Sequence, residues 1–214
     1  MIRNNLATLL AERSLKITKV ASETGISRNT ITSTAQNDGK MIQLETINVL
    51  CQFLNVTPAQ FFDYLPYDFD TKTYLTKTVF KEDPYGPDVL KELEADLFLE
   101  KTSHTPMSKK EFDFIVKLKA PVSADEDDPF LNNDLTMRIS ILLSDKKQVK
   151  SLSDTWLALP AGFKDDLKTQ IMTQVGSDLR KQMIESDKIS WPDQVIDSIQ
   201  MLFSFDFESD LLPF

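Results

Sequence analysis

The sequence predicts an all-α N-terminal domain of five short helices, followed by an α+β domain with a mostly antiparallel sheet. Two observations lead to this division. Apolar residues first recur at helical spacing, whereas after residue 70 they alternate with polar residues as in strands. Between the two patterns, residues 65–70 contain a proline and mark the exit from the first domain. We therefore expect one domain over residues 1–66 and a second over residues 71–214.

Local signals place the helices of the first domain. Gly25 follows an apolar-periodic stretch, where a helix can end by entering the left-handed region that glycine adopts cheaply. Ser27 is a good N-cap for the next helix, and Thr57-Pro58 is a cap followed by proline at the first helical position. The expected helices cover residues 2–14, 17–24, 28–35, 44–54 and 58–62.

The second domain combines strands with longer helices. β-branched, aromatic or alternating patterns predict strands over residues 73–80, 95–101, 111–119, 135–143 and 201–207, and the acidic residues 123–129 are expected to form an exposed loop. Apolar residues recur every four positions from Phe163 to Met183, which predicts a long helix that starts at Pro160. We expect this stripe to lie in the domain's own core rather than at an interface. Trp191-Pro192 opens another short helix.

Composition excludes several classes of protein. A chain of 214 residues with 41% hydrophobic residues has enough apolar side chains for packed cores. Cys51 is the single cysteine and His104 the single histidine, so we expect no disulfide framework, no metal site and no histidine-based catalysis. We find neither a Gly-rich phosphate loop nor an apolar run long enough to span a bilayer. These features predict a cytoplasmic protein that is not an enzyme and takes no cofactor.

Charge is distributed unevenly along the chain. The formal net charge is −9, yet residues 1–40 carry more basic than acidic side chains. The acidic excess therefore belongs to the remainder of the chain. If any part of the molecule faces a polyanion such as DNA, we expect it to be the N-terminal domain.

The order helix, glycine turn, helix around Gly25 is typical of a helix-turn-helix. Ala21 is small enough for the two helices to cross closely, and Ile26 and Ile31 fill the space between them. On this arrangement Arg28, Asn29, Thr32 and Ser33 remain exposed on the last helix. Arginine and asparagine can form paired hydrogen bonds with base edges in the major groove.

A wider pattern surrounds this turn. It comprises Ile2–Leu6, Leu9–Arg13, Val20-Ala21, Thr24–Ile31, Leu44–Ile47, Leu50-Cys51, Leu54–Pro58 and Phe61-Phe62. With this pattern, residues 2–64 resemble the Cro/phage-repressor type of helix-turn-helix domain, the XRE family. The resemblance implies sequence-specific DNA binding, usually as a dimer on a palindromic operator. Lys16 and Ile17 depart from the family, which has a Ser or Thr cap and a DNA-contacting Gln there, and Thr34 replaces a larger apolar residue.

These observations predict a DNA-binding transcriptional regulator, of the phage or mobile-element repressor type, that binds double-stranded operator DNA as a homodimer. The residues expected to contact DNA are Lys16, Thr18, Lys19, Ser27, Arg28, Asn29, Thr30, Thr32, Ser33 and Lys40. The acidic second domain would dimerise the chain and could bind a regulatory protein. The alternative is an interaction or inhibitor protein, whose acidic domain occupies another protein's nucleic-acid site while the helix-turn-helix controls its own expression.

Overall fold

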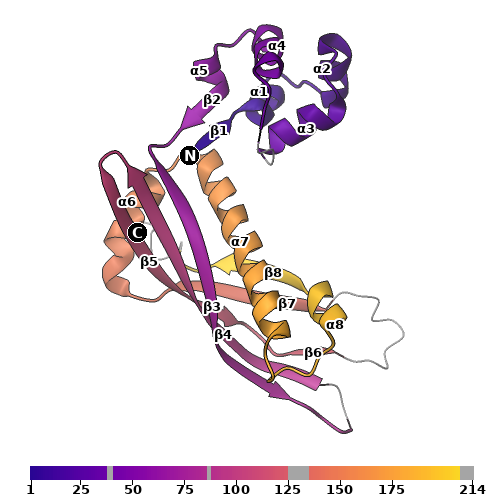
Figure 1. Cartoon of the computed structure of the whole chain (residues 1–214), viewed down its shortest axis with the longest axis vertical. Coiled ribbons are helices and arrows are strands. Elements are labelled where there is room, and N and C mark those ends of the chain that lie inside the picture. The colour runs from indigo at the N-terminus through magenta and orange to yellow at the C-terminus, as the bar shows by residue number, and fades with distance from the viewer. Residues whose placement is uncertain (38–40, 86–87, 125–134, 208–214) are drawn as a thin grey trace. The chain divides into compact units, whose positions relative to one another are not determined.

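The computed structural model describes residues 1–37, 41–85, 88–124 and 135–207 (Figure 1). The chain forms two compact units, Met1–Asp68 and Phe69–Phe214. Lys40 and most of the acidic segment expected to form a loop, residues 125–129, lie outside the described residues. Within the described residues, none of the helices is long and apolar enough to cross a membrane.

The first unit is a helical domain around a small apolar core. Its helices are α1 (Leu6–Glu12), α2 (Ile17–Thr24), α3 (Arg28–Gln36), α4 (Leu44–Leu54) and α5 (Pro58–Phe61). The fully buried side chains that hold them together are Leu6, Val20, Ile31, Leu50 and Phe61. Each helix contributes one of these residues, so burying their apolar surface stabilises the unit as a whole.

The prediction of an all-α, five-helix domain needs correction. Strands β1 (Ile2–Asn4) and β2 (Phe62–Tyr64) form a small antiparallel sheet, and α5 is a single turn. The first helix begins at Leu6 rather than at Ile2, because the side chain of Asn4 accepts a hydrogen bond from the Leu6 N–H (3.0 Å). At the other end, extended backbone at Phe62 terminates α5 and starts β2.

The second unit contains a mostly antiparallel sheet. Its strands are β3 (Tyr67–Lys81), β4 (Asp88–His104), β5 (Met107–Leu118), β6 (Val122–Ala124), β7 (Thr136–Leu143) and β8 (Gln200–Phe205). The order across the sheet is β3-β4-β5-β7-β8, with β6 paired to β4. β5 pairs antiparallel with both β4 and β7, whereas β8 pairs parallel to β7. The expected strand over residues 95–101 was too short, and β6 occupies the start of the expected loop.

The helices of this unit are α6 (Val149–Leu157), α7 (Ala161–Ile184) and α8 (Asp193–Ser198), with a short 3-10 helix η1 (Lys146–Gln148) before α6. The apolar stripe of α7 from Phe163 to Met183 is buried, which confirms that it lies in the core of its own unit. Trp156 and Trp191 are buried as well. α6 was not predicted from the sequence; it buries only a few apolar residues.

Polar side chains of α7 cover one edge of the sheet. The Leu75 N–H of edge strand β3 donates to Gln182 Oε1 (2.7 Å), and Gln182 Nε2 donates to the Thr73 carbonyl (2.9 Å). The Thr73 N–H donates to Asp178 (3.3 Å), and Gln170 Nε2 donates to the Phe69 carbonyl (3.0 Å). These bonds occupy backbone groups to which another strand would otherwise pair.

Candidate nucleic-acid interface

A glycine turn joins α2 to α3. Gly25 has φ 75°, in the left-handed region, and its N–H donates to the Ala21 carbonyl at 3.0 Å. No atom lies within 4 Å of the position of an added Cβ, so a substitution here is opposed by backbone strain rather than by a clash. The Thr24 hydroxyl donates to the Val20 carbonyl (2.7 Å) and accepts from the Ile26 N–H (3.2 Å). The turn is therefore fixed by local contacts.

Ser27 caps the start of α3. Its hydroxyl oxygen accepts from the Thr30 N–H at 3.1 Å, and the two hydroxyl groups lie 2.8 Å apart. An N-cap of this kind stabilises a helix by about 1 kcal/mol. Ser27 and Thr30, both predicted to contact DNA, thus also have a structural role, although both remain exposed.

The two faces of α3 differ in what they contact. Ile31 and Thr34 are buried, with Ile31 in the core. Arg28 and Asn29 are exposed, and neither forms a side-chain hydrogen bond or ion pair within the described residues. Thr32 and Ser33 were expected to be exposed but are half-buried, and the Ser33 hydroxyl lies 3.5 Å from the Thr30 carbonyl.

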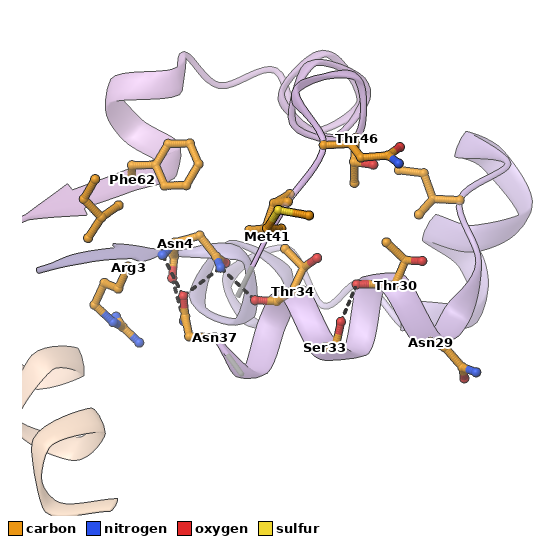
Figure 2. A pocket seen from close by; sticks show the side chains of 14 residues that line it. Arg3, Asn4, Asn29, Thr30, Ser33, Thr34, Asn37, Met41, Thr46 and Phe62 are labelled. Carbon is orange, nitrogen blue, oxygen red and sulfur yellow. Dashed lines mark hydrogen bonds between the residues drawn. The ribbon is translucent and has the colours of Figure 1, made fainter. Parts of the chain in front are cut away.

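An asparagine pair fixes the C-terminal end of α3 to β1 (Figure 2). Asn37 ends the helix with φ 56°, and its Oδ1 accepts from the Asn4 N–H (2.8 Å) and from Asn4 Nδ2 (2.7 Å). Asn37 Nδ2 donates in return to the Asn4 carbonyl (3.1 Å). Asn4 Nδ2 also donates to the Thr34 carbonyl at 2.7 Å, so this buried stretch of α3 is anchored by hydrogen bonds. The pairing of these two asparagines was not predicted from the sequence.

A cavity of about 680 Å³ opens beside α3. Figure 2 shows side chains from β1, α3, α4 and β2 around it. Asn29 and Ser33 line it from α3, together with Gln43 and Thr46. Arg3 contributes a positive charge to the lining and was not assigned from the sequence. The predicted residues Asn29, Thr30 and Ser33 therefore line the same cavity as the polar side chains of Gln43, Thr46 and Arg3.

The predicted basic residues of α2 are exposed. Lys16 occupies the N-cap position in extended conformation, and Thr18 lies in the first turn. Lys19 faces Glu23 one turn later, with 3.8 Å between Nζ and the carboxylate. An exposed pair of this kind contributes little and leaves the lysine available to another anion. Ile17, noted as a departure from the DNA-contacting Gln of the resembled family, is half-buried.

Cys51 lies in the core of the first unit and is not part of this surface. Burial raises the pKa of its thiol, which keeps the sulfur protonated near neutral pH. Within the described parts of the chain, no group of three or more His, Cys, Asp or Glu side chains is placed to hold a metal ion.

The fold and surface of the first unit define a helix-turn-helix domain, and comparison with known proteins gives its family. Residues 5–66 match the family of Cro/C1-type helix-turn-helix DNA-binding domains, and this part of the chain is such a domain. Among solved structures, the chain is similar to a candidate DNA-binding protein from Bacteroides fragilis. That similarity has 28% sequence identity and a TM-score of 0.28, and it covers 29% of this chain and 100% of the other. A comparison with curated proteins finds no match.

Proposed function

We propose that this chain is a sequence-specific transcriptional regulator, a repressor of the phage or mobile-element type, that binds operator DNA as a dimer. One observation carries the proposal: Arg28 and Asn29 are exposed at the start of α3, on a Cro/C1-type domain, and make no side-chain bond to the described protein. Arginine pairs with guanine and asparagine with adenine in the major groove. Both side chains therefore remain available to read bases.

The remaining predicted residues position the domain on the DNA backbone. Lys16 at the N-cap of α2 and Lys19 within α2 neutralise phosphates, as does Lys40, which lies outside the described residues. Thr18, Thr32 and Ser33 add hydroxyl groups. The N–H groups of Arg28 and Asn29 at the start of α3 attract a phosphate as well, whereas that of Thr30 already donates to Ser27. Phosphate contacts contribute affinity without base preference and make binding sensitive to salt.

The second unit supplies dimerisation and regulation in this proposal. A single helix-turn-helix covers a half-site, and joining two of them raises the effective concentration of the second for its own half-site. The acidic excess of the chain, with its net charge of −9, disfavours DNA contact by this unit. Such a regulator works in the cytoplasm, and a regulatory protein partner would bind the same unit.

Fluorescence anisotropy with the full chain tests the proposal. The probes are a duplex from the chain's own upstream region and a shuffled duplex of equal composition. We expect tighter binding to the first duplex, with affinity falling linearly on a log scale as salt rises. Binding that is absent, or equal for both duplexes at all salt concentrations, would contradict sequence-specific regulation. A reporter fused to the same upstream region should give less signal when the chain is present, and an increase would exclude repression.

A further inference from the structure

The second edge of the sheet, strand β8, presents backbone groups with no partner among the described residues. The N–H groups of Gln200 and Asp206 donate to carbonyls of Leu135 (2.8 Å) and Ile141 (3.0 Å), beside and on β7. In a parallel pair, alternate residues face the neighbouring strand. The N–H and C=O groups of Met201, Phe203 and Phe205 therefore point away from β7.

Side chains of helix α7 form hydrogen bonds with the backbone of β3 at one edge of the sheet but not with that of Met201, Phe203 and Phe205 at the other, within the described residues. On β3 it covers successive backbone groups with Gln170, Asp178 and Gln182. On the opposite side, Arg180 Nη2 donates to the Ile199 carbonyl at 2.7 Å, just before β8 begins. Within the parts of the chain that the structure describes, no α7 side chain hydrogen-bonds to the backbone of Met201, Phe203 or Phe205. Among the described residues, the backbone groups without a partner thus begin at Met201, two residues after the carbonyl that Arg180 binds.

The side chains of β8 suit contact with a second copy of the chain. All six residues of the strand are uncharged, in a chain whose net charge is −9. The nearest acid that follows, Asp206, is paired with Lys119 at 3.3 Å. Two acidic copies can approach along such a strand with less repulsion than elsewhere on their surfaces. Leu202 is 46% exposed on this strand, which adds apolar area to the contact.

We propose that β8 pairs antiparallel with β8 of a second copy, about a two-fold axis through Phe203. This register pairs Phe203 with its own counterpart and Met201 with Phe205 of the second copy, so every outward-facing residue of the strand is hydrogen-bonded. The two sheets then become one continuous sheet across the dimer. The inference rests on the dimer in the proposed function and names its surface. The tests below contain no DNA, so their failure would leave DNA reading by α3 intact.

The register makes a specific prediction for cross-linking. Leu202 lies opposite Ser204 of the second copy in a non-hydrogen-bonded pair, where Cα atoms are about 4.5 Å apart. That separation permits a disulfide. The full-length double variant Leu202→Cys/Ser204→Cys should form a covalent dimer on mild oxidation. The single variant Leu202→Cys should not form a covalent dimer. In this register position 202 of one copy lies diagonally from position 202 of the other, and their Cα atoms are more than about 7 Å apart. Equal cross-linking of both variants, or of neither, would overturn this register.

A matched pair of variants at Phe203 tests the hydrogen bonds. Phe203→Ala removes the ring but keeps the outward N–H, whereas Phe203→Pro also removes the N–H without breaking a bond to β7. In sedimentation equilibrium we expect the dimer dissociation constant of Phe203→Pro to exceed that of Phe203→Ala by ~10- to 100-fold. Identical constants, or a monomeric wild-type chain at micromolar concentration, would overturn the proposal.

Amide hydrogen exchange on the wild-type chain separates a second copy from another occupant. The N–H groups of Met201, Phe203 and Phe205 should exchange more slowly as the protein concentration rises, because only the dimer protects them. Protection that does not change with concentration would mean that another segment of the same chain occupies the edge, and it would refute pairing between copies. This measurement needs no substitution and stands even if the proline variant fails to fold.

Discussion

The contacts described within the two units of the molecule join residues at very different separations along the chain. In the first, the turn at Gly25 and the cap at Ser27 position the start of α3, and their partners lie only three or four residues away. In the second, β8 pairs with β7, and Gln182 bonds to Leu75 across 107 residues. The comparison teaches that a turn and a helix start built from local contacts can be predicted from the sequence, whereas for a sheet built from distant contacts the sequence predicts only the fold class.

The largest effect should come from emptying the core beneath α3. Ile31→Ala removes a fully buried side chain and is expected to destabilise the first unit by about 2–5 kcal/mol. Both tryptophans, Trp156 and Trp191, lie in the second unit, so their fluorescence reports that unit alone. On heating, circular dichroism should show an early loss of helix while the tryptophan transition stays in place.

The matched control for Ile31→Ala is Ile184→Ala, at the partly exposed end of α7. It should change stability by about 0.5 kcal/mol at most. If Ile31→Ala shifted the tryptophan transition as far as the helix signal, the two units would unfold together and the comparison between them would fail.

Base reading should depend on Arg28 and not on the lysines of α2. Arg28→Ala should lower affinity by about 1–3 kcal/mol at one base-pair position and relax preference there. Lys19→Ala should weaken binding to all duplexes equally and reduce the salt slope by about one. Competition binding with single-base-pair variants of the operator measures both effects. Identical profiles for the two variants would contradict the roles assigned to α3 and α2.

The covered edge of the sheet gives a third prediction. Gln182→Ala leaves the Leu75 N–H and the Thr73 carbonyl without their α7 partner and should destabilise the second unit by about 1–2 kcal/mol. Urea unfolding followed by tryptophan fluorescence measures the change. Gln194→Ala is the control, because Gln194 is exposed on α8 and forms no hydrogen bond with β3 within the described residues. Equal effects of the two variants would remove the role given to the edge contacts.

The smallest effect concerns Asp206, which follows β8. The hydroxyl of Ser140 donates to its carboxylate and lowers its pKa, with further contributions from Ser204 and Lys119. Because the pKa is lower in the folded state, this stabilisation is present above the unfolded value of about 3.9 and is lost as the pH falls through the folded value. Asp206→Asn should therefore cost about 1 kcal/mol or less at pH 7, since the carboxylate is partly exposed.

Unfolding of both proteins in urea at pH 7 and near pH 3 checks the sign of this contribution. The difference in unfolding free energy between wild type and Asp206→Asn should shrink at the lower pH. A difference that grows on acidification would show that the carboxylate is not stabilised in the folded state.

Local chemistry explains which elements the sequence predicted well. Gly25 and Ser27 placed the end of α2 and the start of α3, and the four-residue apolar repeat placed α7 within one or two residues. β1 was missed because Asn4 finds its partners, Thr34 and Asn37, about thirty residues later. The edge contacts of β3 and the parallel pairing of β8 were not predicted, because their partners also lie far away in the sequence.

The candidate site was predicted unevenly. The exposure of Arg28 and Asn29 follows from helical periodicity and the position of Ile31. The half-burial of Thr32 and Ser33 does not follow from the periodicity of the helix, because it depends on residues outside α3. Arg3 and the asparagine pair were assigned no role from the sequence, although Arg3 and Asn4 lie within the Ile2–Leu6 segment of the pattern, since a short polar segment before a helix has many conformations open to it.

Different residues of α3 stabilise the helix and face solvent, which affects how the sequence of this domain can evolve. Ser27, Ile31 and Thr34 hold the helix in place, whereas Arg28 and Asn29 bond to nothing else in the described chain. If α3 reads bases as proposed, new side chains at positions 28 and 29 would alter which DNA is recognised at almost no cost in folding. A lineage, or a designer, could retarget the domain by varying these two positions while leaving its scaffold untouched.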